Sequence, residues 1–520
     1  MHSITLAAGQ VTAPSVNYAA VAPVLILLGA ACLSVLVEAF LPKHLRWLAQ
    51  VVLSLVALLV AGITLGVYLG NAPSSGVTTF AGAISVDHPA LFLWGTLLAI
   101  GFCSILLIAD RSLESGGSIV AQAAIRPGTV QDRAQLTSTD MQTEVFPLAL
   151  FALSGMMIFC AANDLLTMFV ALEVLSLPLY LMCGLARRRR LLSQESAVKY
   201  FLLGAFGSAF FLYGLALLYG FANSVKLADI ATAAAGTNRS DSLLFIGLGL
   251  LLVGLLFKGS VGPFHTWTPD VYQGAPTPVT AFMASCTKIA AFGAILRVLF
   301  VAFSSTSWEW RGVLWAVAIV SMLIGAILGL TQTDVKRMIA YSSIAHAGFL
   351  LVGAIALTSK GISSTLFYLI AYGFTAMAAF GVISLVRTAD GEATHLSSWR
   401  GLGKRSPIVA GVFTFLLLAM AGIPLTSGFI GKFVVFSAAL SDGMAPLVVI
   451  ALIASTIAAF FYLRVIVLMY FFDPAPDGPT VSVPGMFTTA AITLGVFLTL
   501  LLGIWPSFML DWASSSGFAS

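Results

Sequence analysis

Long apolar stretches, separated by short polar segments, follow one another along almost the whole chain. A helix that crosses a lipid bilayer needs about 20 mostly apolar residues, and most of the stretches are about this long. The pattern therefore predicts an all-α polytopic membrane protein with about fourteen transmembrane helices. We expect these spans at residues 18–40, 47–70, 90–109, 145–163, 165–186, 196–222, 243–267, 278–303, 312–331, 334–357, 362–386, 407–440, 447–471 and 486–508.

The seventh and twelfth predicted spans contain clusters of helix-breaking residues. In the seventh, Lys258 is followed by Gly-Ser-Val-Gly-Pro, and the apolar stretch continues to about Trp267. In the twelfth, Gly-Ile-Pro at 422–424 is followed by Lys432. Proline removes a backbone donor and clashes with the preceding turn, and broken backbone inside a membrane is tolerated only where it is buried in protein or lines a wet cavity. We therefore predict that helices 7 and 12 are broken and adjoin polar interior space.

The two broken helices are five spans apart, which predicts an internal repeat. Spans 4–8, at 145–303, would form a first five-helix unit, and spans 9–13, at 304–471, a second one, with the broken helix fourth in each. Because five is odd, the second unit would be inverted, as in many transporters whose sites lie near the membrane midplane. Residues 1–144 would carry spans 1–3 and a cytoplasmic loop, and residues 472–520 the last span.

Composition excludes several classes of protein. Of the 520 residues, 59% are hydrophobic and 9% charged, whereas soluble domains carry about 25% charged residues. The net charge of +4 provides no basic field suited to nucleic acid. The five cysteines stand singly in apolar stretches, and neither a phosphate-binding loop nor a dinucleotide fingerprint is present. We therefore expect no cofactor or metal to be bound by this chain.

The distribution of Lys and Arg predicts the orientation in the membrane. One side would receive fifteen of these residues in five loops, including the run 187–190, and the other side only four. Cytoplasmic loops carry the excess of positive charge, so both termini are expected on the outer face. The longest loop, 110–144, is expected to be a mobile cytoplasmic connection.

Four charged residues lie well inside the predicted spans, away from their ends, where an ionisable side chain costs at least about 2.5–3.5 kcal/mol and is usually functional. They are Glu173, Lys258, Lys288 and Lys432. A lysine near internal water can release and regain a proton, which an arginine cannot. We therefore predict a proton relay, with a Glu173–Lys258 ion pair, Lys288 as the central carrier and Lys432 as a gate.

Other polar residues in the spans are weaker candidates. We expect possible relay roles for His346, His265, Lys199 and Lys336, although a histidine can equally be a hydrogen-bonded structural residue and a lysine near a helix end can extend to the interface. Three further charged residues are near span ends and are expected to be interfacial: Glu38, Arg297 and Arg464.

Several segments resemble a known family. Residues 171–180 (Ala-Leu-Glu-Val-Leu-Ser-Leu-Pro-Leu-Tyr), 196–205 and 258–278 are similar to signatures of subunit N of respiratory complex I, the proton-translocating NADH-quinone oxidoreductase. Residues 422–432 resemble a motif shared by its antiporter-like subunits. Subunit M usually has glutamate at the position of Lys432, and subunit L usually adds a lateral helix after the last span. Both differences favour the subunit N family.

The resemblance implies a membrane-arm subunit that moves protons along Glu173, Lys258, Lys288 and Lys432. It also implies that FMN, iron–sulfur clusters and quinone are bound by partner subunits, and that subunits M, K and J are neighbours in a bacterial plasma membrane. Two alternatives remain open. The chain could be a large subunit of a multi-subunit cation/proton antiporter, or a scaffold whose buried charges are only structural.

Overall fold

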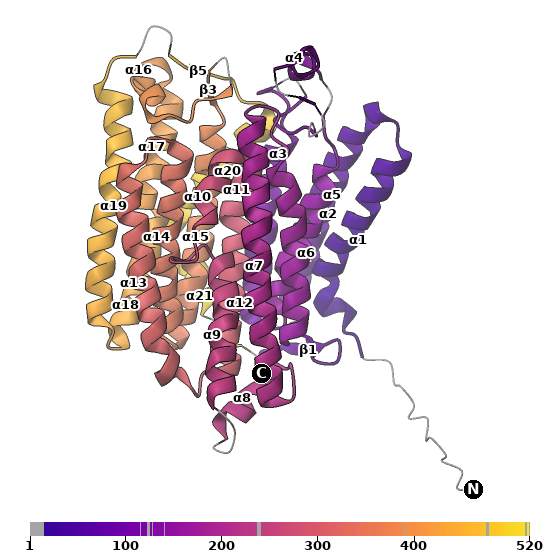
Figure 1. Ribbon diagram of the computed structural model, residues 1–520, viewed down its shortest axis with the longest axis vertical. Helices are drawn as coiled ribbons and strands as arrows, with labels where there is room; N and C mark the ends of the chain where they lie inside the picture. The colour runs from indigo at the N-terminus through magenta and orange to yellow at the C-terminus, as the bar shows by residue number, and fades with distance from the viewer. Residues whose placement is uncertain are drawn as a thin grey trace.

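Helices lie side by side along one direction and form the body of the molecule in this computed structural model (Figure 1). The structure describes residues 15–520 except for 115, 122–124, 127, 140, 237–240, 389–390, 475–477, 515–516 and 519–520. The chain begins with α1 (Tyr18–Phe40), α2 (Lys43–Leu69) and α3 (His88–Ala109). The next long helices are α5 (Val145–Ala161), α6 (Leu165–Cys183) and α7 (Arg190–Ala222).

The second part of the chain contains the interrupted helices. In chain order these are α9 (Asp241–Lys258), α10 (Trp267–Gly274), α11 (Thr277–Phe282), a π-helical turn Met283–Thr287, α12 (Lys288–Arg297), a second π-helical turn Val298–Ala302, α13 (Ser307–Thr331), α14 (Val335–Ile355), α15 (Ser359–Ile383), α17 (Pro407–Ala421), α18 (Ser427–Ser441), α19 (Ala445–Phe471) and α20 (Met486–Ile504).

Short elements lie at the two ends of the bundle. They are the helices α4 (Val130–Thr137), α8 (Leu227–Ala235), α16 (Leu402–Arg405) and α21 (Ser507–Ala513), the 3₁₀ turn Leu396–Trp399, and the strands β1 (Val77–Thr79), β2 (Ile84–Val86), β3 (Val386–Thr388), β4 (Gly391–Glu392) and β5 (Thr480–Val481). The β1–β2 pair is antiparallel, and β3 pairs with both β4 and β5. Figure 1 shows α4, α16 and β3 at one end and α8 and β1 at the other, so the basic loops 110–144 and 387–406 share one end.

The helix count agrees with the sequence-based prediction. Within the described residues, twelve helices are long and apolar enough to cross a membrane. Three shorter apolar helices are α5, α17 and α18. If α17 and α18 are the halves of one broken span, these helices correspond to the fourteen predicted spans, and the interruptions at α9–α10 and α17–α18 fall in helices 7 and 12.

The seventh span differs from the prediction in its extent. Helix α9 ends at Lys258, and the second half begins only at Trp267 and continues to Gly274. The predicted end near Trp267 was therefore wrong. The continuation was missed because the stretch Thr268-Pro269-Asp270 is polar, although Trp267, Val271 and Tyr272 on the same short helix are buried.

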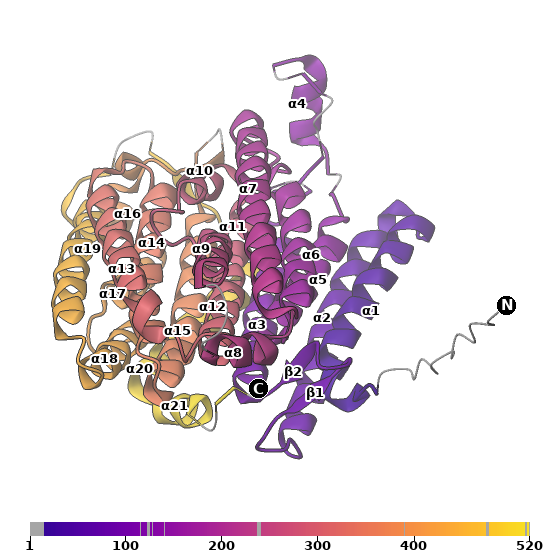
Figure 2. The ribbon, with the colours of Figure 1, turned by 60° about the horizontal axis from the view of Figure 1, so that its bottom comes forward.

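Burial divides the helices into a core and an outer ring. In their most apolar stretches, 94% of the residues of 277–302 and of α14 are buried, and all of those of α15, compared with 33% for α2 and α7. Large apolar side chains are exposed along the outer helices, among them Ile63, Phe206 and Phe460, as expected for surfaces that contact lipid. Figure 2 shows α12 and α15 between α19 on one flank and the α1–α2 pair on the other.

Candidate functional site

Lys258 lies where α9 ends and is almost fully enclosed. Its side chain is 2% exposed, and its Nζ donates hydrogen bonds to Ser176 Oγ at 2.8 Å and to the Tyr200 hydroxyl at 3.1 Å. The apolar sequence of 241–257 forms the helix, and a lysine in its last turn is favoured by the free carbonyls there. The ammonium thus meets hydroxyl oxygens on α6 and α7.

Glu173 does not form the direct ion pair with Lys258 that we expected. It lies on α6, one turn before Ser176, and its Oε1 is buried without a hydrogen-bond partner in the structure. On α6, the group that contacts the Lys258 ammonium is the Ser176 hydroxyl. Glu173 is therefore a carboxylate with spare hydrogen-bonding capacity close to the first lysine.

Lys288 follows the π-helical turn Met283–Thr287 directly. It is 1% exposed, donates a hydrogen bond to the Ser343 carbonyl at 2.5 Å, and its Nζ lies 5.4 Å from the centre of the Tyr372 ring. The Ser343 Oγ and the Tyr372 hydroxyl are buried atoms without hydrogen-bond partners in the structure. Single π-helical turns are common at functional sites, and this one was not predicted from the sequence.

His346 lies on α14, one turn after Ser343, and is 2% exposed. Its Nδ1 is 2.6 Å from the Tyr368 hydroxyl, and its Nε2 is 3.4 Å from the Tyr462 hydroxyl. Both ring nitrogens therefore face hydroxyl groups, which can either donate or accept. The imidazole lies between the surroundings of Lys288 and those of Lys432.

Lys432, on α18, contacts the broken end of α17. Its Nζ donates to the carbonyls of Met420 at 3.0 Å and Ala421 at 2.9 Å, and to Ser455 Oγ at 2.9 Å. These carbonyls belong to the last turn of α17 and lack partners within the helix, because Gly422 turns the chain with a φ of +87°.

Phe349 connects this lysine to the histidine. The Lys432 Nζ lies 5.2 Å from the centre of the Phe349 ring, and the ring centres of Phe349 and His346 are 5.7 Å apart in an edge-to-face arrangement.

The three lysines share one chemical environment. Among the described residues, Lys258, Lys288 and Lys432 form no ion pair within 4.0 Å and bind only neutral oxygens. A carboxylate would stabilise the charged ammonium by Coulomb attraction as well as by a hydrogen bond, whereas neutral carbonyl and hydroxyl oxygens supply the hydrogen bond alone. The arrangement is suited to carrying protons between successive groups.

Among the weaker candidates, His265 and Lys336 are buried and Lys199 is partly exposed. His265 lies in the break between α9 and α10, is 8% exposed, and its buried Nδ1 has no hydrogen-bond partner in the structure. Lys199 is 41% exposed and forms ion pairs with Glu195 at 2.6 Å and Asp270 at 2.7 Å. Lys336 is 1% exposed and donates to the carbonyl of Ala275 and to Thr277 Oγ1. Its side chain is therefore buried, unlike that of Lys199, and the relay role expected for it stays a prediction.

Two functional features were missed from the sequence. Asp270 on α10 forms ion pairs with Lys199 and, at 2.5 Å, with Arg337, so it joins the second half of helix 7 to α7 and α14. Arg297, which was expected to be interfacial, has a partner that the sequence did not indicate. It is fully buried and contacts both carboxylate oxygens of Asp87, at 2.9 and 2.8 Å. Asp270 is a single carboxylate next to Pro269, and Asp87 is 210 residues away from Arg297. Neither ion pair therefore produces a local sequence pattern.

The described residues contain no group of three or more His, Cys, Asp or Glu side chains that could hold a metal ion, and the five cysteines are free thiols. Four of these thiols are buried, and Cys32 is exposed. Cys160 and Cys183 lie within hydrogen-bonding distance of a backbone carbonyl and a methionine sulfur.

Comparison with known proteins places the chain in a family. A model of the family described as "NADH:quinone oxidoreductase/Mrp antiporter, TM" matches residues 162–458. The chain is 73% identical to NADH-quinone oxidoreductase subunit N of Saccharopolyspora erythraea over 98% of this chain and all of that protein. It is 58% identical to the subunit N of Acidothermus cellulolyticus over 97% of both chains.

Two solved structures have folds similar to this chain. A chain of respiratory complex I from Thermus thermophilus with bound aureothin is 31% identical, covers 95% of this chain and 100% of its own length, and superposes with a TM-score of 0.75. A chain of the Mrp complex from Dietzia sp. DQ12-45-1b gives a TM-score of 0.79 at 19% identity, covering 95% of this chain and 96% of its own. That second likeness shows a shared fold alone.

Proposed function

The chain belongs to the subunit N family of NADH-quinone oxidoreductases, and from this premise we propose that it translocates protons across the membrane within such an enzyme. Electrons would pass from NADH to quinone in other subunits. The chain is then a non-redox part of a translocase, and its own chemistry is the movement of H⁺.

The observation that carries this proposal is the set of buried lysines with neutral partners. Lys258, Lys288 and Lys432 each lie inside the helix bundle, and each ammonium is hydrogen-bonded by carbonyl or hydroxyl oxygens. Ionisable groups at this depth are expensive and usually functional. We assign them, with Glu173, to the relay, with Lys288 as its central carrier and Lys432 as its gate.

Of the remaining candidates, one fits the middle of such a path and three fit its entry. His346 would carry protons between the surroundings of Lys288 and Lys432, because its two nitrogens face hydroxyl groups. Lys199, together with Asp270, would receive protons at the end of the bundle that carries the basic loops. Lys336 contacts the residues that follow α10, and His265 lies in the break of helix 7, and both would support this entry.

The surroundings of the subunit follow from the same premise. FMN, iron–sulfur clusters and quinone would be bound by partner chains, and subunits M, K and J would be the membrane neighbours. The enzyme would lie in a bacterial plasma membrane, with the basic loops in the cytoplasm and both termini outside. Labelling of a cysteine introduced at Ser514, in intact cells, tests this orientation, and labelling only after the cells are broken would contradict it.

The central test replaces Lys288 in the assembled enzyme. Lys288→Arg keeps a positive charge that does not release its proton at physiological pH, and Lys288→Ala removes the charge. We expect both variants to reduce proton pumping in vesicles at least about tenfold relative to NADH oxidation, because each removes a required proton-transfer step. The exposed Lys360, changed to Ala, is the matched control and should pump normally.

Two outcomes would contradict the proposal. Assembled Lys288→Ala enzyme that pumps fully would favour the scaffold alternative. Restoration of pumping by Lys288→Arg would mean that the charge, and not its titration, is required.

The antiporter alternative is kept because the fold is shared with a chain of the Mrp complex. It predicts Na⁺ or another cation exchanged for H⁺ without NADH oxidation, and a purified assembly that contains no NADH-oxidising subunit. Our proposal predicts that NADH oxidation activity co-purifies with the chain. It also predicts that the assembly exchanges no cation when NADH is not being oxidised.

A further inference from the structure

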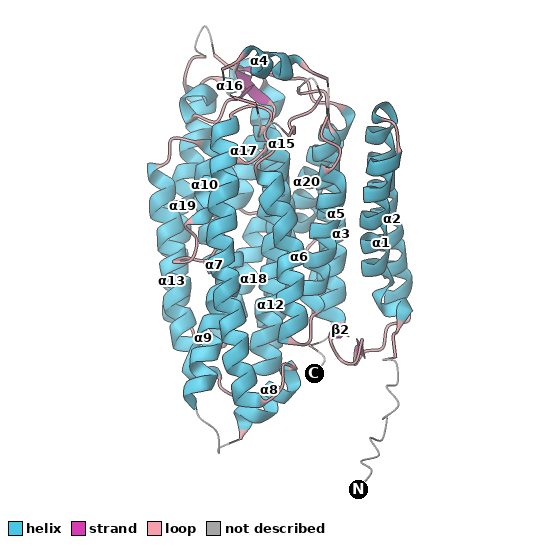
Figure 3. Cartoon of the chain, turned by 45° about the vertical axis from the view of Figure 1, so that its right-hand side comes forward, coloured by secondary structure: helices cyan, strands magenta, loops and turns pink. Residues whose placement is uncertain are grey.

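Trp267 begins α10, the second half of the broken helix 7, and its side chain is fully buried. Figure 3 shows α10 above α9, toward the end of the bundle that carries α16. The indole N–H of Trp267 donates a hydrogen bond to the carbonyl of Phe257 at 3.0 Å. This carbonyl belongs to the last turn of α9, where carbonyls lack partners within the helix, and it also accepts the N–H of Ser260 at 3.1 Å. One side chain thus bridges the break at 259–266 and joins the two halves of helix 7.

The same indole packs against Tyr200, which binds the Lys258 ammonium. The rings of Trp267 and Tyr200 are stacked, with their centres 4.4 Å apart and their planes 10° from parallel. Tyr200 lies on α7, is fully buried, and its hydroxyl accepts a hydrogen bond from Lys258 Nζ at 3.1 Å. On its other side, Tyr180 of α6 meets the Tyr200 ring edge-on at 4.6 Å between centres. The position of this hydroxyl therefore depends on the start of α10.

Two hydroxyl groups bind the Lys258 ammonium, those of Ser176 and Tyr200, and among the described residues Lys258 forms no ion pair within 4.0 Å. A hydrogen bond to an ammonium favours its charged form over the neutral amine. The Tyr200 hydroxyl is thus one of two contacts that favour the protonated lysine. The other titratable side chains around the Lys258–Tyr200 pair are Glu173, Tyr180 and Cys183 of α6 and Tyr272 of α10.

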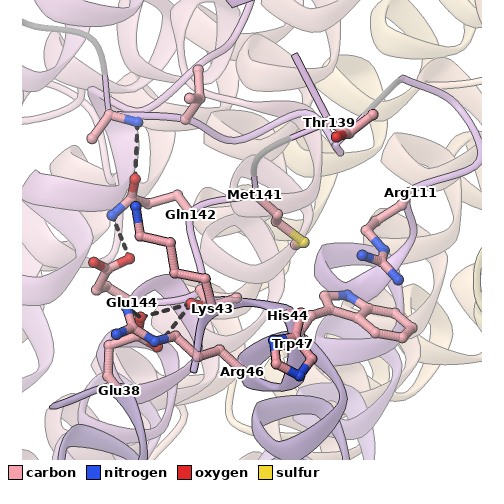
Figure 4. Close-up of a pocket in the computed structure, with 13 residues that line it drawn as sticks. Glu38, Lys43, His44, Arg46, Trp47, Arg111, Thr139, Met141, Gln142 and Glu144 are labelled. Atoms are coloured by element: carbon pink, nitrogen blue, oxygen red, sulfur yellow. Dashed lines mark hydrogen bonds and ion pairs between the residues drawn. The ribbon is translucent and has the colours of Figure 1, made fainter. Parts of the chain in front are cut away.

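Two other tryptophans hold helix ends with the same kind of hydrogen bond. The Trp310 indole N–H donates to the carbonyl of Phe303 at 2.9 Å, just after the second π-helical turn. The Trp47 indole N–H donates to the carbonyl of Ala109, the last residue of α3, at 3.2 Å. Figure 4 shows Trp47 in a polar cavity of about 520 Å³ at the start of α2, where Arg111 lies over its ring. In the described structure neither indole stacks on a residue that binds a relay lysine, so both are matched controls.

We propose that Trp267 is a positioning residue of the proton relay, whose indole joins the halves of helix 7 and holds the Tyr200 hydroxyl against the Lys258 ammonium. This role rests on the function proposed above, because the position of Tyr200 affects pumping only if Lys258 carries protons. Trp267 carries no proton of the relay itself, since an indole N–H is only a donor. Movement of α10 away from α9 would withdraw Trp267 from Tyr200 and so change the hydrogen bonding of Lys258.

Proton pumping by the assembled enzyme in vesicles, measured against pH and relative to NADH oxidation, tests this role. Tyr200→Phe removes the hydroxyl, and Trp267→Phe keeps an aromatic ring but removes the indole N–H. We expect Tyr200→Phe to move the alkaline half-point of pumping about one pH unit lower, because the ammonium loses a hydrogen bond that favours its charge. Trp267→Phe should move the half-point in the same direction by at least about half as much, because the Tyr200 hydroxyl is no longer held in place.

The double variant Trp267→Phe/Tyr200→Phe separates positioning from general damage. If Trp267 acts through Tyr200, the double variant shifts the half-point no further than Tyr200→Phe alone, since the effects of coupled residues do not add. The controls Trp310→Phe and Trp47→Phe lose the same kind of hydrogen bond and should keep the half-point of the unaltered enzyme. Trp267→Tyr also lacks the indole N–H; it serves if Trp267→Phe does not assemble, and it should shift the half-point in the same direction.

The outcomes that would overturn the role are distinct. An unshifted half-point in Tyr200→Phe would show that the hydroxyl does not act on Lys258. An unshifted half-point in Trp267→Phe alone would show that the indole does not hold the hydroxyl. Added shifts in the double variant would mean that Trp267 acts by another route, and an equal shift in Trp310→Phe would mean a general effect of losing an indole. Failure of the proposed function differs from all of these, because it appears as full pumping by Lys288→Ala and would remove this role as well.

Discussion

Each of the three buried lysines lies at an irregularity of the backbone. Lys258 is the last residue of α9, Lys288 follows a π-helical turn, and Lys432 contacts the broken end of α17. In a regular helix the carbonyls are occupied by the helix itself. The broken end of α17 frees backbone oxygens for Lys432, and the end of α9 places Lys258 beside hydroxyl groups, whereas Lys288 binds the Ser343 carbonyl inside the continuous helix α14. The surroundings of two of the three proposed relay lysines therefore depend on where helices end.

Asp110 provides a test at the residue scale, outside the membrane spans. Its Oδ1 accepts a hydrogen bond from the N–H of Ser112, and its Oδ2 accepts one from the N–H of Thr488, which ties the end of α3 to the start of α20. Burial alone would raise the pKa of this carboxyl, but the hydrogen bonds from Ser112 and Thr488 outweigh it and the pKa is lowered.

We therefore expect Asp110→Asn to lower the free energy of unfolding by about 2 kcal/mol at pH 7, because two hydrogen bonds lose their charged acceptor. The folded pKa lies below the unfolded value of about 3.9, so the contribution is present above pH 4 and is lost as the pH falls through the folded pKa. Thermal unfolding between pH 8 and pH 3 measures it. Asp511→Asn at an exposed position is the control, and a difference that persists unchanged at pH 3 would contradict this account.

The buried charged residues could be predicted from sequence, but their partners could not. Lys288 and Lys432 stand out because a charge interrupts an apolar stretch. Ser176, which takes the place expected for Glu173 beside Lys258, comes from a helix 82 residues away, and nothing local to either residue indicates the contact. The Arg297–Asp87 ion pair was missed for the same reason, since the position of Arg297 near a span end gave no indication of Asp87.

At the scale of elements, the α17–α18 break depends on close packing of its two halves. A Cβ at Gly428, in the first turn of α18, would lie 1.9 Å from the carbonyl oxygen of Ala419. Only glycine lets α18 approach the end of α17 this closely, and this approach brings Lys432 to the carbonyls of Met420 and Ala421.

We expect Gly428→Ala to destabilise the fold by roughly 1–3 kcal/mol through overpacking and to reduce proton pumping, because the halves must separate. Gly411→Ala, on α17 with no atom within 4 Å of the added Cβ, should leave both unchanged. Thermal unfolding and vesicle pumping measure the two effects. Equal behaviour of the two variants would show that the contact is unimportant.

The extent of the helices was largely predictable, whereas the geometry of the breaks was not. Hydrophobic length sets the span ends, and α1 agrees with the predicted 18–40. The break after Lys258 runs to Thr266, because α10 resumes on a polar segment whose burial depends on contacts with α7 and α14. The π-helical turns left no pattern in the sequence.

At the scale of the molecule, the arginine run 187–190 does more than set orientation. Arg187 donates to the carbonyls of Gly116, Gly117 and Ser138, and Arg190 forms an ion pair with Asp132 at 2.7 Å. The described part of 110–144, which we expected to be a mobile connection, also carries α4. The run therefore fastens this segment to the start of α7.

We expect Arg187→Gln to speed tryptic cleavage at Arg126 or Arg133 by about fivefold, because local opening of the segment becomes easier when charged hydrogen bonds are lost. Inside-out vesicles and timed digestion measure the rate. Arg189→Gln removes a neighbouring arginine that contacts Thr394 instead and should have little effect. Identical digestion of both variants would refute the fastening role.

The burial of α14 and α15 determines how the protein responds to a change in membrane thickness. A membrane whose hydrocarbon thickness differs from the apolar length of a helix imposes hydrophobic mismatch, which helices relieve by tilting. Here that tilt would fall on the peripheral helices α2, α7, α13, α19 and α20, which bury at most 39% of their apolar stretches. The innermost helices touch almost no lipid, so thinning or thickening the membrane should disturb assembly with neighbours before it alters the spacing of the ammonium groups.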